Sequence, residues 1–136
     1  AVTIDLGDVK GVWAQEDYQY FEIMILDDQS ERAYGADYSK FEFLSDATPY
    51  DTIYTTAGVR YIFAAADVPD EVEISFNYLL GHSYSVNVYG FTSDDLSYTN
   101  RITLNVDDET DSGATFIDGT LTCTEENTNI RLSVSD

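Results

Sequence analysis

Residues 71–91 read EVEISFNYLLGHSYSVNVYGF, and this stretch decides the fold class. Its apolar residues stand at every second position on both sides of a Leu-Gly-His segment: Val72, Ile74, Phe76, Tyr78, Tyr84, Val86 and Val88. A period of two places successive side chains on opposite faces of a β-strand. The stretch therefore predicts two consecutive strands joined by a turn.

The same period recurs along most of the chain. It predicts further strands over residues 2–6, 41–43, 59–65, 102–106, 115–124 and 130–134. The run over 18–26 is apolar on both faces apart from Gln19 and Glu22, as expected for a central strand. We expect a short helical turn over residues 30–34, an acidic connection over 107–113, and a hairpin that joins 115–124 to 130–134. Many short strands with polar turns indicate one all-β domain over residues 1–136, an antiparallel β-sandwich with an extra C-terminal hairpin.

The segment LLGHSYSVNVYGF, residues 79–91, resembles the last strands of fibronectin type III and related immunoglobulin-like β-sandwich modules of bacterial surface proteins. The resemblance extends over residues 72–106, and the long strand over 18–26 is similar to the equivalent strand of such modules. It implies that Tyr84 is the corner tyrosine whose hydroxyl pins the preceding turn. It also implies a binding or spacer module, although a fold does not fix a function.

The charge of the chain limits its partners. Twenty-six Asp and Glu residues face six Lys and Arg residues, which gives a net charge of -20. Such a surface repels phosphate backbones and anionic lipids, so we expect neither a nucleic-acid partner nor a membrane-surface role. No apolar run is long enough to span a membrane. The chain begins at Ala1 without methionine, which fits removal of a signal peptide or of an expression tag, and we expect a secreted or cell-surface protein.

The residues for catalysis are scarce. The chain has one histidine, His82, and one cysteine, Cys123, so a zinc site or a Ser-His-Asp site would have to rely on these single residues. Carboxylate pairs are inevitable among 26 acids and therefore carry no information. Cys123 lies in an alternating run and is expected to be a small buried residue. We predict that the chain is not an enzyme.

Calcium is the one cofactor that the composition suggests. Asp107, Asp108, Glu109 and Asp111 crowd a single connection, and hard carboxylate oxygens suit calcium. The spacing is not that of an EF-hand loop. Solvated turn residues are the alternative interpretation.

Aromatic residues suggest a ligand surface. Trp13, Tyr34 and Tyr98 lie in or near predicted loops, where exposed rings could contact a glycan. The alternative is that these rings are buried at strand ends, with only their polar atoms in water.

The N-terminal residues suggest assembly. Val2, Ile4 and Leu6 form an alternating strand at the chain end, followed by Gly7 as a possible hinge. A terminal strand can pair in its own sheet or complete the sheet of another copy, and repeated donation gives a filament. The leading hypothesis is a structural or adhesive subunit whose partners are protein subunits, including copies of itself. The alternative is a carbohydrate- or protein-binding module of a larger secreted protein.

Two observations separate these hypotheses. A first strand that is paired in its own sheet, with no unfilled groove, would show that strand donation is wrong. A cluster of exposed aromatic side chains on one face favours the binding module.

Overall fold

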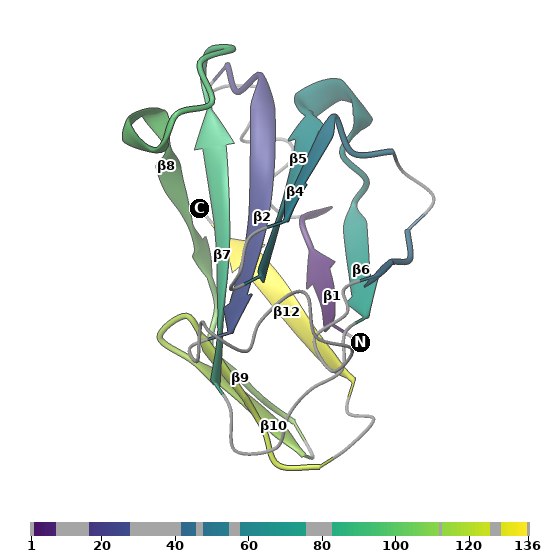
Figure 1. Cartoon of the computed structure of the whole chain (residues 1–136). Coiled ribbons are helices and arrows are strands. Elements are labelled where there is room, and N and C mark those ends of the chain that lie inside the picture. The colour runs from purple at the N-terminus through teal and green to yellow at the C-terminus, as the bar shows by residue number, and fades with distance from the viewer. Residues whose placement is uncertain are drawn as a thin grey trace.

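The structure is a computed structural model that describes residues 2–7, 17–27, 42–45, 48–54, 58–75, 83–111, 113–125 and 129–135. These residues form strands and two short 3-10 helices, so the all-β prediction is confirmed (Figure 1). The strands are β1 (Val2–Asp5), β2 (Tyr20–Asp27), β3 (Glu42–Phe43), β4 (Asp51–Tyr54), β5 (Gly58–Ala64), β6 (Glu71–Ser75), β7 (Ser83–Phe91), β8 (Ile102–Val106), β9 (Glu109–Asp111), β10 (Ala114–Ile117), β11 (Thr120–Cys123) and β12 (Ile130–Ser135). The 3-10 helices are η3 (Ala65–Asp67) and η4 (Tyr98–Asn100).

Strand β7 is the centre of the sheet. One of its edges pairs with β2 along nearly its whole length, and the other edge is shared by β8 and β11. From β2 the sheet continues to β5 and β4, and from β8 it continues through β12, β1 and β6 to β3. Because β1 and β12 are parallel and the other pairs are antiparallel, the sheet is mixed.

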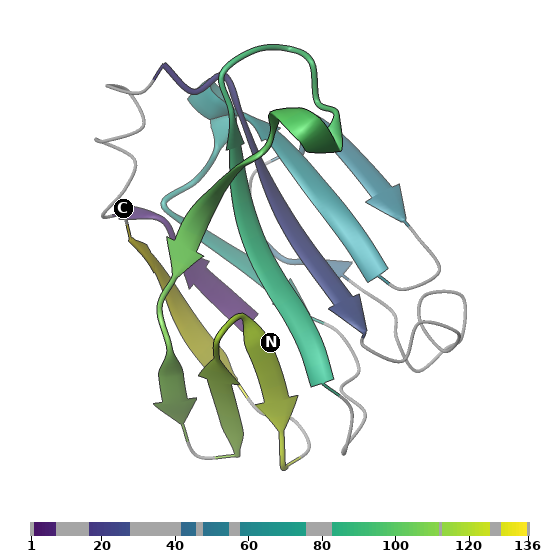
Figure 2. The ribbon, with the colours of Figure 1, turned by 90° about the vertical axis from the view of Figure 1, so that its left-hand side faces the viewer.

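The sheet curls, so that β1, β6 and β12 lie across the molecule from β2, β5 and β7 (Figures 1 and 2). The core lies between these two parts, and strands of both contribute its largest side chains. Its large, fully buried rings include Phe21, Phe63, Tyr61, Tyr84 and Phe116.

Alternation explains which side chains reach this core. In β7 the residues at even positions from Tyr84 to Val88 are buried and their neighbours are half-buried. In β6, Val72 and Ile74 are buried while Glu71 and Glu73 are exposed. Cys123 is buried as predicted, and this burial raises the pKa of its thiol.

The predicted C-terminal hairpin is wrong in its partners. Residues 115–124 do not form one strand, because β10 and β11 fold back on each other at Asp118 and Gly119. Both of these turn residues have positive φ angles, 50° and 81°, as a two-residue type I′ turn requires. Strand β12 pairs instead with β1 and β8.

Two further strands differ from the prediction. Strand β4 lies in a stretch for which no strand was predicted, and β9 lies within the predicted acidic connection. The predicted helical turn over residues 30–34 and the turn over residues 80–82 lie outside the described residues.

Candidate functional site

Strand β1 occupies the middle of its part of the sheet. It lies between β12, to which it is parallel, and β6, to which it is antiparallel. The predicted assembly residues Val2, Ile4 and Leu6 are fully buried. The Leu6 backbone N–H extends the pairing by donating to the Asp70 carbonyl oxygen at 2.7 Å. The chain therefore fills this groove with its own first strand.

The outer face of β1 carries an exposed ion-pair cluster. Arg131 of β12 bonds Asp5 of β1 at 3.0 Å and also bonds Glu71 of β6. The Gly7 N–H donates to Asp5 at 2.9 Å, and this bond and Arg131 lower the pKa of Asp5. The hydrogen bonds that Arg131 donates to Glu71 and Asp5 raise the pKa of Arg131. A shallow hollow of about 410 Å³ lies beside this cluster and includes Thr3 and Arg131 in its lining.

The proposed calcium residues are held by other contacts. Asp107 accepts hydrogen bonds from Asn105 and Ser135, and Asp108 accepts one from the Asp118 backbone N–H. Glu109 and Asp111 are exposed in β9. Within the described ranges, no three His, Cys, Asp or Glu side chains gather in a group that could hold a metal ion.

A second hollow, of about 400 Å³, lies where the edge of β7 passes from β11 to β8. Val86 and Asn87 of β7, the two acids Asp108 and Asp118, and Thr103 of β8 belong to its lining. Its walls are mainly amide, hydroxyl and carboxylate groups, which suit water better than an apolar ligand.

Of the three proposed ligand aromatics, Trp13 and Tyr34 lie outside the described residues. Tyr98 lies in η4 with 62% of its surface exposed. Its ring centroid is 4.1 Å from Cζ of Arg101 and 4.8 Å from Cζ of Arg60. Both guanidiniums are therefore within the range of a cation–π contact with one exposed ring.

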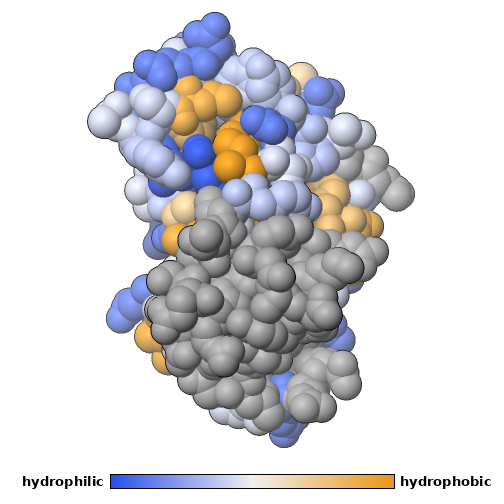
Figure 3. Space-filling view, viewed as in Figure 1, coloured by the Kyte–Doolittle hydropathy of each residue, from blue (hydrophilic) through white to orange (hydrophobic). Residues whose placement is uncertain are grey.

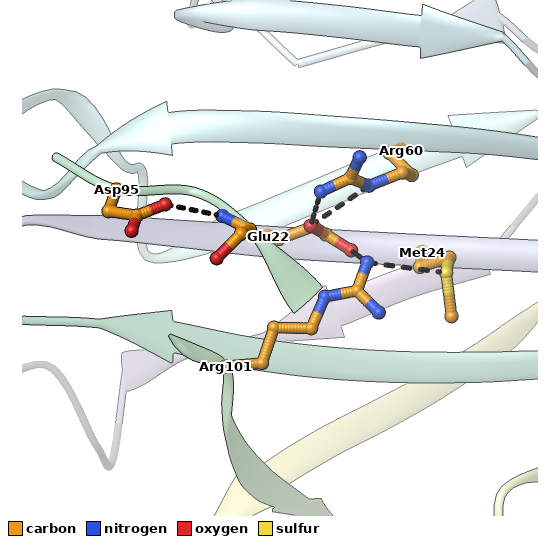
Figure 4. Close-up of polar contacts among 6 residues, drawn as sticks. Glu22, Met24, Arg60, Asp95 and Arg101 are labelled. Carbon is orange, nitrogen blue, oxygen red and sulfur yellow. Dashed lines mark hydrogen bonds and ion pairs between the residues drawn. The ribbon is translucent and has the colours of Figure 1, made fainter. Parts of the chain in front are cut away.

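Beneath this ring lies a completely buried carboxylate, Glu22 of β2. Arg60 Nε and Nη2 donate to Glu22 Oε1 at 3.0 and 2.6 Å, and Arg101 Nη2 donates to Glu22 Oε2 (Figure 4). We call Glu22, Arg60 and Arg101 the ion trio. Arg101 also lies 4.2 Å from the centroid of the Tyr89 ring.

The register of the strands explains why these groups meet. Phe21, Ile23 and Ile25 of β2 belong to the core, so the residues between them point to the outer face of the sheet. Residues directly opposite each other in an antiparallel pair share a face. Glu22 is opposite Tyr89 of β7, and Met24 is opposite Arg60 of β5.

The environment shifts the proton affinities of this region. Burial lowers the pKa of Arg60, but the hydrogen bond and charge of Glu22 outweigh it and leave the pKa above its ordinary value. Burial raises the pKa of Tyr89. Tyr20, on the same outer face, has its pKa raised by burial and by Tyr50, whose ring lies 4.9 Å away in an edge-to-face contact. These groups keep their ordinary protonation near neutral pH.

We call this surface, formed by Tyr20, Tyr50, Tyr89 and Tyr98 around the ion trio, the tyrosine face. Its Tyr98 loop is held by hydrogen bonds around Asp95. The Ser97 N–H donates to Asp95 Oδ1 at 3.2 Å, the Asn100 amide donates to the Asp95 carbonyl at 3.3 Å, and the Asp95 N–H donates to Ser93 Oγ at 3.3 Å. The Ser97 contacts lower the pKa of Asp95.

Sequence reasoning identified Tyr98 but not the ion trio. A signal was present, because Glu22 and Arg60 each lie in the middle of an apolar strand. A charged residue in such a position needs a buried partner of opposite charge. Which residues pair depends on the strand register, and the sequence did not reveal it.

No protein-family model, no curated protein and no solved structure matches this chain. Among the described residues, no helix is both long enough and apolar enough to cross a membrane.

Proposed function

We propose that this chain is a non-catalytic structural subunit of the cell exterior that joins its copies by exchanging strand β1. In this proposal the domain is an immunoglobulin-like β-sandwich whose first strand can complete a neighbour's sheet. The observation that supports it is the pairing of β1, which lies between β12 and β6, so that an identical strand of a second copy fits the same place.

The burial of β1 makes an empty groove unfavourable. Burying one large aliphatic side chain stabilises a fold by about 1.5–3 kcal/mol, and Val2, Ile4 and Leu6 are all fully buried. Their sum is comparable with the total stability of an ordinary domain, about 5–15 kcal/mol. The groove between β6 and β12 is therefore occupied either by the chain's own strand or by that of a neighbour.

Because β1 is paired in its own sheet, donation into a vacant groove is not available to this form of the chain. Exchange requires β1 to leave first, after which a second copy offers an identical strand to β6 and β12. Nine residues separate Gly7 from Asp17 in the sequence, and nine extended residues reach about 30 Å. A strand of the same chain competes at an effective concentration on the order of millimolar. We therefore expect exchange during folding at high protein concentration.

A disulfide between β1 and β6 tests this directly. Thr3 and Glu73 are direct partners across the antiparallel pair. Such partners have Cα atoms about 4.5–5.5 Å apart, a range that disulfides span. A single chain carries Thr3→Cys and Glu73→Cys together with Cys123→Ala. It is refolded under reducing conditions at high concentration and then oxidised. If exchange occurs, the new disulfide joins different chains and gives a covalent ladder in a denaturing, non-reducing gel.

The control pair is Thr115→Cys with Thr122→Cys, direct partners in the β10–β11 hairpin. This pair is expected to give only single chains, because hairpin strands are not exchanged. Multimers in which the β1–β6 disulfide stays within each chain would show assembly through another surface. A monomer at every concentration would remove the proposal.

A further inference from the structure

The tyrosine face lies on the part of the sheet opposite β1, and it is independent of strand exchange. Its base is the ion trio, which contains a carboxylate with no exposed surface. Moving such a charge out of water costs several kcal/mol, and well-packed hydrophobic residues often stabilise a fold equally well. Stability alone therefore does not require the ion trio, because hydrophobic residues could replace it. Its additional effect is to fix the position of the side chain that lies above it.

The group that it fixes is Tyr98. Two guanidiniums lie against the ring, Glu22 holds both guanidiniums, and the Asp95 hydrogen bonds hold the loop. Tyr98 as a whole nevertheless keeps 62% of its surface exposed. A ring that is already ordered loses little conformational freedom when it binds a partner, which favours affinity.

A second exposed ring lies further along the same face. Tyr50 is 60% exposed and contacts Tyr20. Tyr20 and Met24 are four residues apart on β2, which corresponds to about 13 Å along a strand. Since Tyr98 lies above Glu22 and Arg60, the two exposed rings are on the order of 10 Å apart. A ligand that contacts both must be an elongated molecule.

The chemistry of the surroundings narrows the class of ligand. The ion trio carries two positive charges and one negative charge, Asp51 interacts with Arg60, Asp94 interacts with Tyr20, and the chain has a net charge of -20. A polyanion is repelled by such a chain, whereas an uncharged ligand meets no such repulsion.

The shape of the face also favours a polar, extended ligand. Neither of the two hollows described above is lined by Tyr50 or Tyr98. Figure 3, in the view of Figure 1, shows outside its grey part small hydrophobic areas interspersed with hydrophilic residues. Tyrosine offers an apolar ring and a hydroxyl together, and therefore suits a ligand with apolar C–H surfaces and hydroxyl groups.

We propose that the tyrosine face binds a neutral oligosaccharide or polysaccharide, with Tyr98 and Tyr50 stacking against sugar rings and the ion trio holding Tyr98 in place. This inference assigns a binding site to a part of the molecule that strand exchange does not use.

The test is gel electrophoresis through neutral polysaccharides (xylan, galactomannan, hydroxyethyl cellulose and mixed-linkage glucan) and through acidic ones (alginate and hyaluronan). The intact chain is expected to be retarded by at least one neutral polymer. Tyr98→Ala is expected to weaken that binding at least ten-fold, and Tyr50→Ala several-fold. Ile117→Ala removes an exposed side chain of β10 and serves as the matched control, with no change expected.

Circular dichroism checks that each variant folds, which we expect because both rings are largely exposed. Tyr98→Phe retains the ring and is expected to retain most of the binding. Three results would overturn the proposal: no retardation by any neutral polymer, retardation by acidic polymers alone, or unchanged retardation of the double variant Tyr50→Ala/Tyr98→Ala.

Discussion

The two outer faces of the sheet both carry a cluster of arginine and carboxylate, but they differ in burial. In the ion trio the Glu22 side chain is 0% exposed, and those of Arg60 and Arg101 are 10% and 11% exposed. On the face of β1, the side chains of Arg131, Asp5 and Glu71 are 51%, 34% and 52% exposed. One cluster shares a carboxylate between two guanidiniums, and the other shares a guanidinium between two carboxylates.

The difference in burial decides what each cluster does. Water screens the exposed cluster, so each of its pairs contributes about 0–1 kcal/mol. In the ion trio both the attraction and the cost of desolvation are large, and they nearly cancel while all partners are present. The exposed cluster therefore connects β6, β1 and β12 only weakly. The ion trio is rigid, and removing one of its members is expected to lower the free energy of unfolding strongly.

Breaking the ion trio is expected to have the largest effect. Glu22→Gln keeps the side-chain volume but leaves two guanidiniums together in a buried site, and we expect a loss of about 3–5 kcal/mol in the free energy of unfolding. The matched variant Glu71→Gln in the exposed cluster is expected to lose less than about 1 kcal/mol. Urea unfolding measures both, and equal losses would show that burial does not distinguish the clusters.

Replacing the ion trio as a whole sharpens the comparison. The triple variant Glu22→Leu/Arg60→Met/Arg101→Met removes every charge at once, so no uncompensated charge remains. We expect its unfolding free energy to be unchanged or higher by about 1–4 kcal/mol. The same urea measurement decides, and a loss close to that of Glu22→Gln would mean that the ion trio stabilises the fold directly. The binding of neutral polysaccharide by this triple variant is expected to weaken as much as in Tyr98→Ala.

The local pattern of the sequence predicted individual strands well. Alternation located β1, β6 and β7, because the side-chain period depends only on neighbouring residues. The long apolar run of β2 also indicated a strand with neighbours on both sides, and it pairs with β5 and β7.

Pairing between distant residues was harder to predict. Strand β12 was assigned to the hairpin nearest in sequence, but it pairs with β1 at the opposite end of the chain. The Asp118-Gly119 turn has a recognisable sequence signal, since Asp-Gly favours a two-residue hairpin. The meeting of Glu22 with Arg101 depends on a loop that folds over β2, and the alternation of residues carries no information about it.

Salt is expected to affect the coupling energies of the two clusters differently, by less than the losses in unfolding free energy expected above. The coupling energy of Arg131 with Glu71 comes from a double-mutant cycle of Arg131→Gln and Glu71→Gln. We expect it to be below about 1 kcal/mol at low salt and to approach zero at about 1 M salt, where charges are screened within about 3 Å. The coupling of Arg60 with Glu22, measured with Arg60→Gln and Glu22→Gln, is expected to persist. If salt removes both couplings equally, solvent reaches the ion trio.

Acid is expected to reveal the smallest effect, at Asp5 in the exposed cluster. Its pKa in the folded protein lies below the ordinary value of 3.8, chiefly because the Gly7 N–H donates to the carboxylate and secondly because of Arg131. A lowered folded pKa gives a stabilisation that is complete above 3.8 and is lost as the pH falls through the folded value. As the pH is lowered from about 5 to about 2, the Tm of Asp5→Asn should therefore fall less steeply than the Tm of the original chain.

The order of the two causes can be tested in the same range of pH. Because the Gly7 N–H is the larger cause, Arg131→Gln is expected to retain most of the acid dependence that Asp5→Asn removes. If Arg131→Gln instead flattens the profile as much as Asp5→Asn, the exposed ion pair would be the dominant contact. The exposed cluster over β1 would then contribute more to stability than its exposure implies. The two clusters would differ only in the size of their contributions.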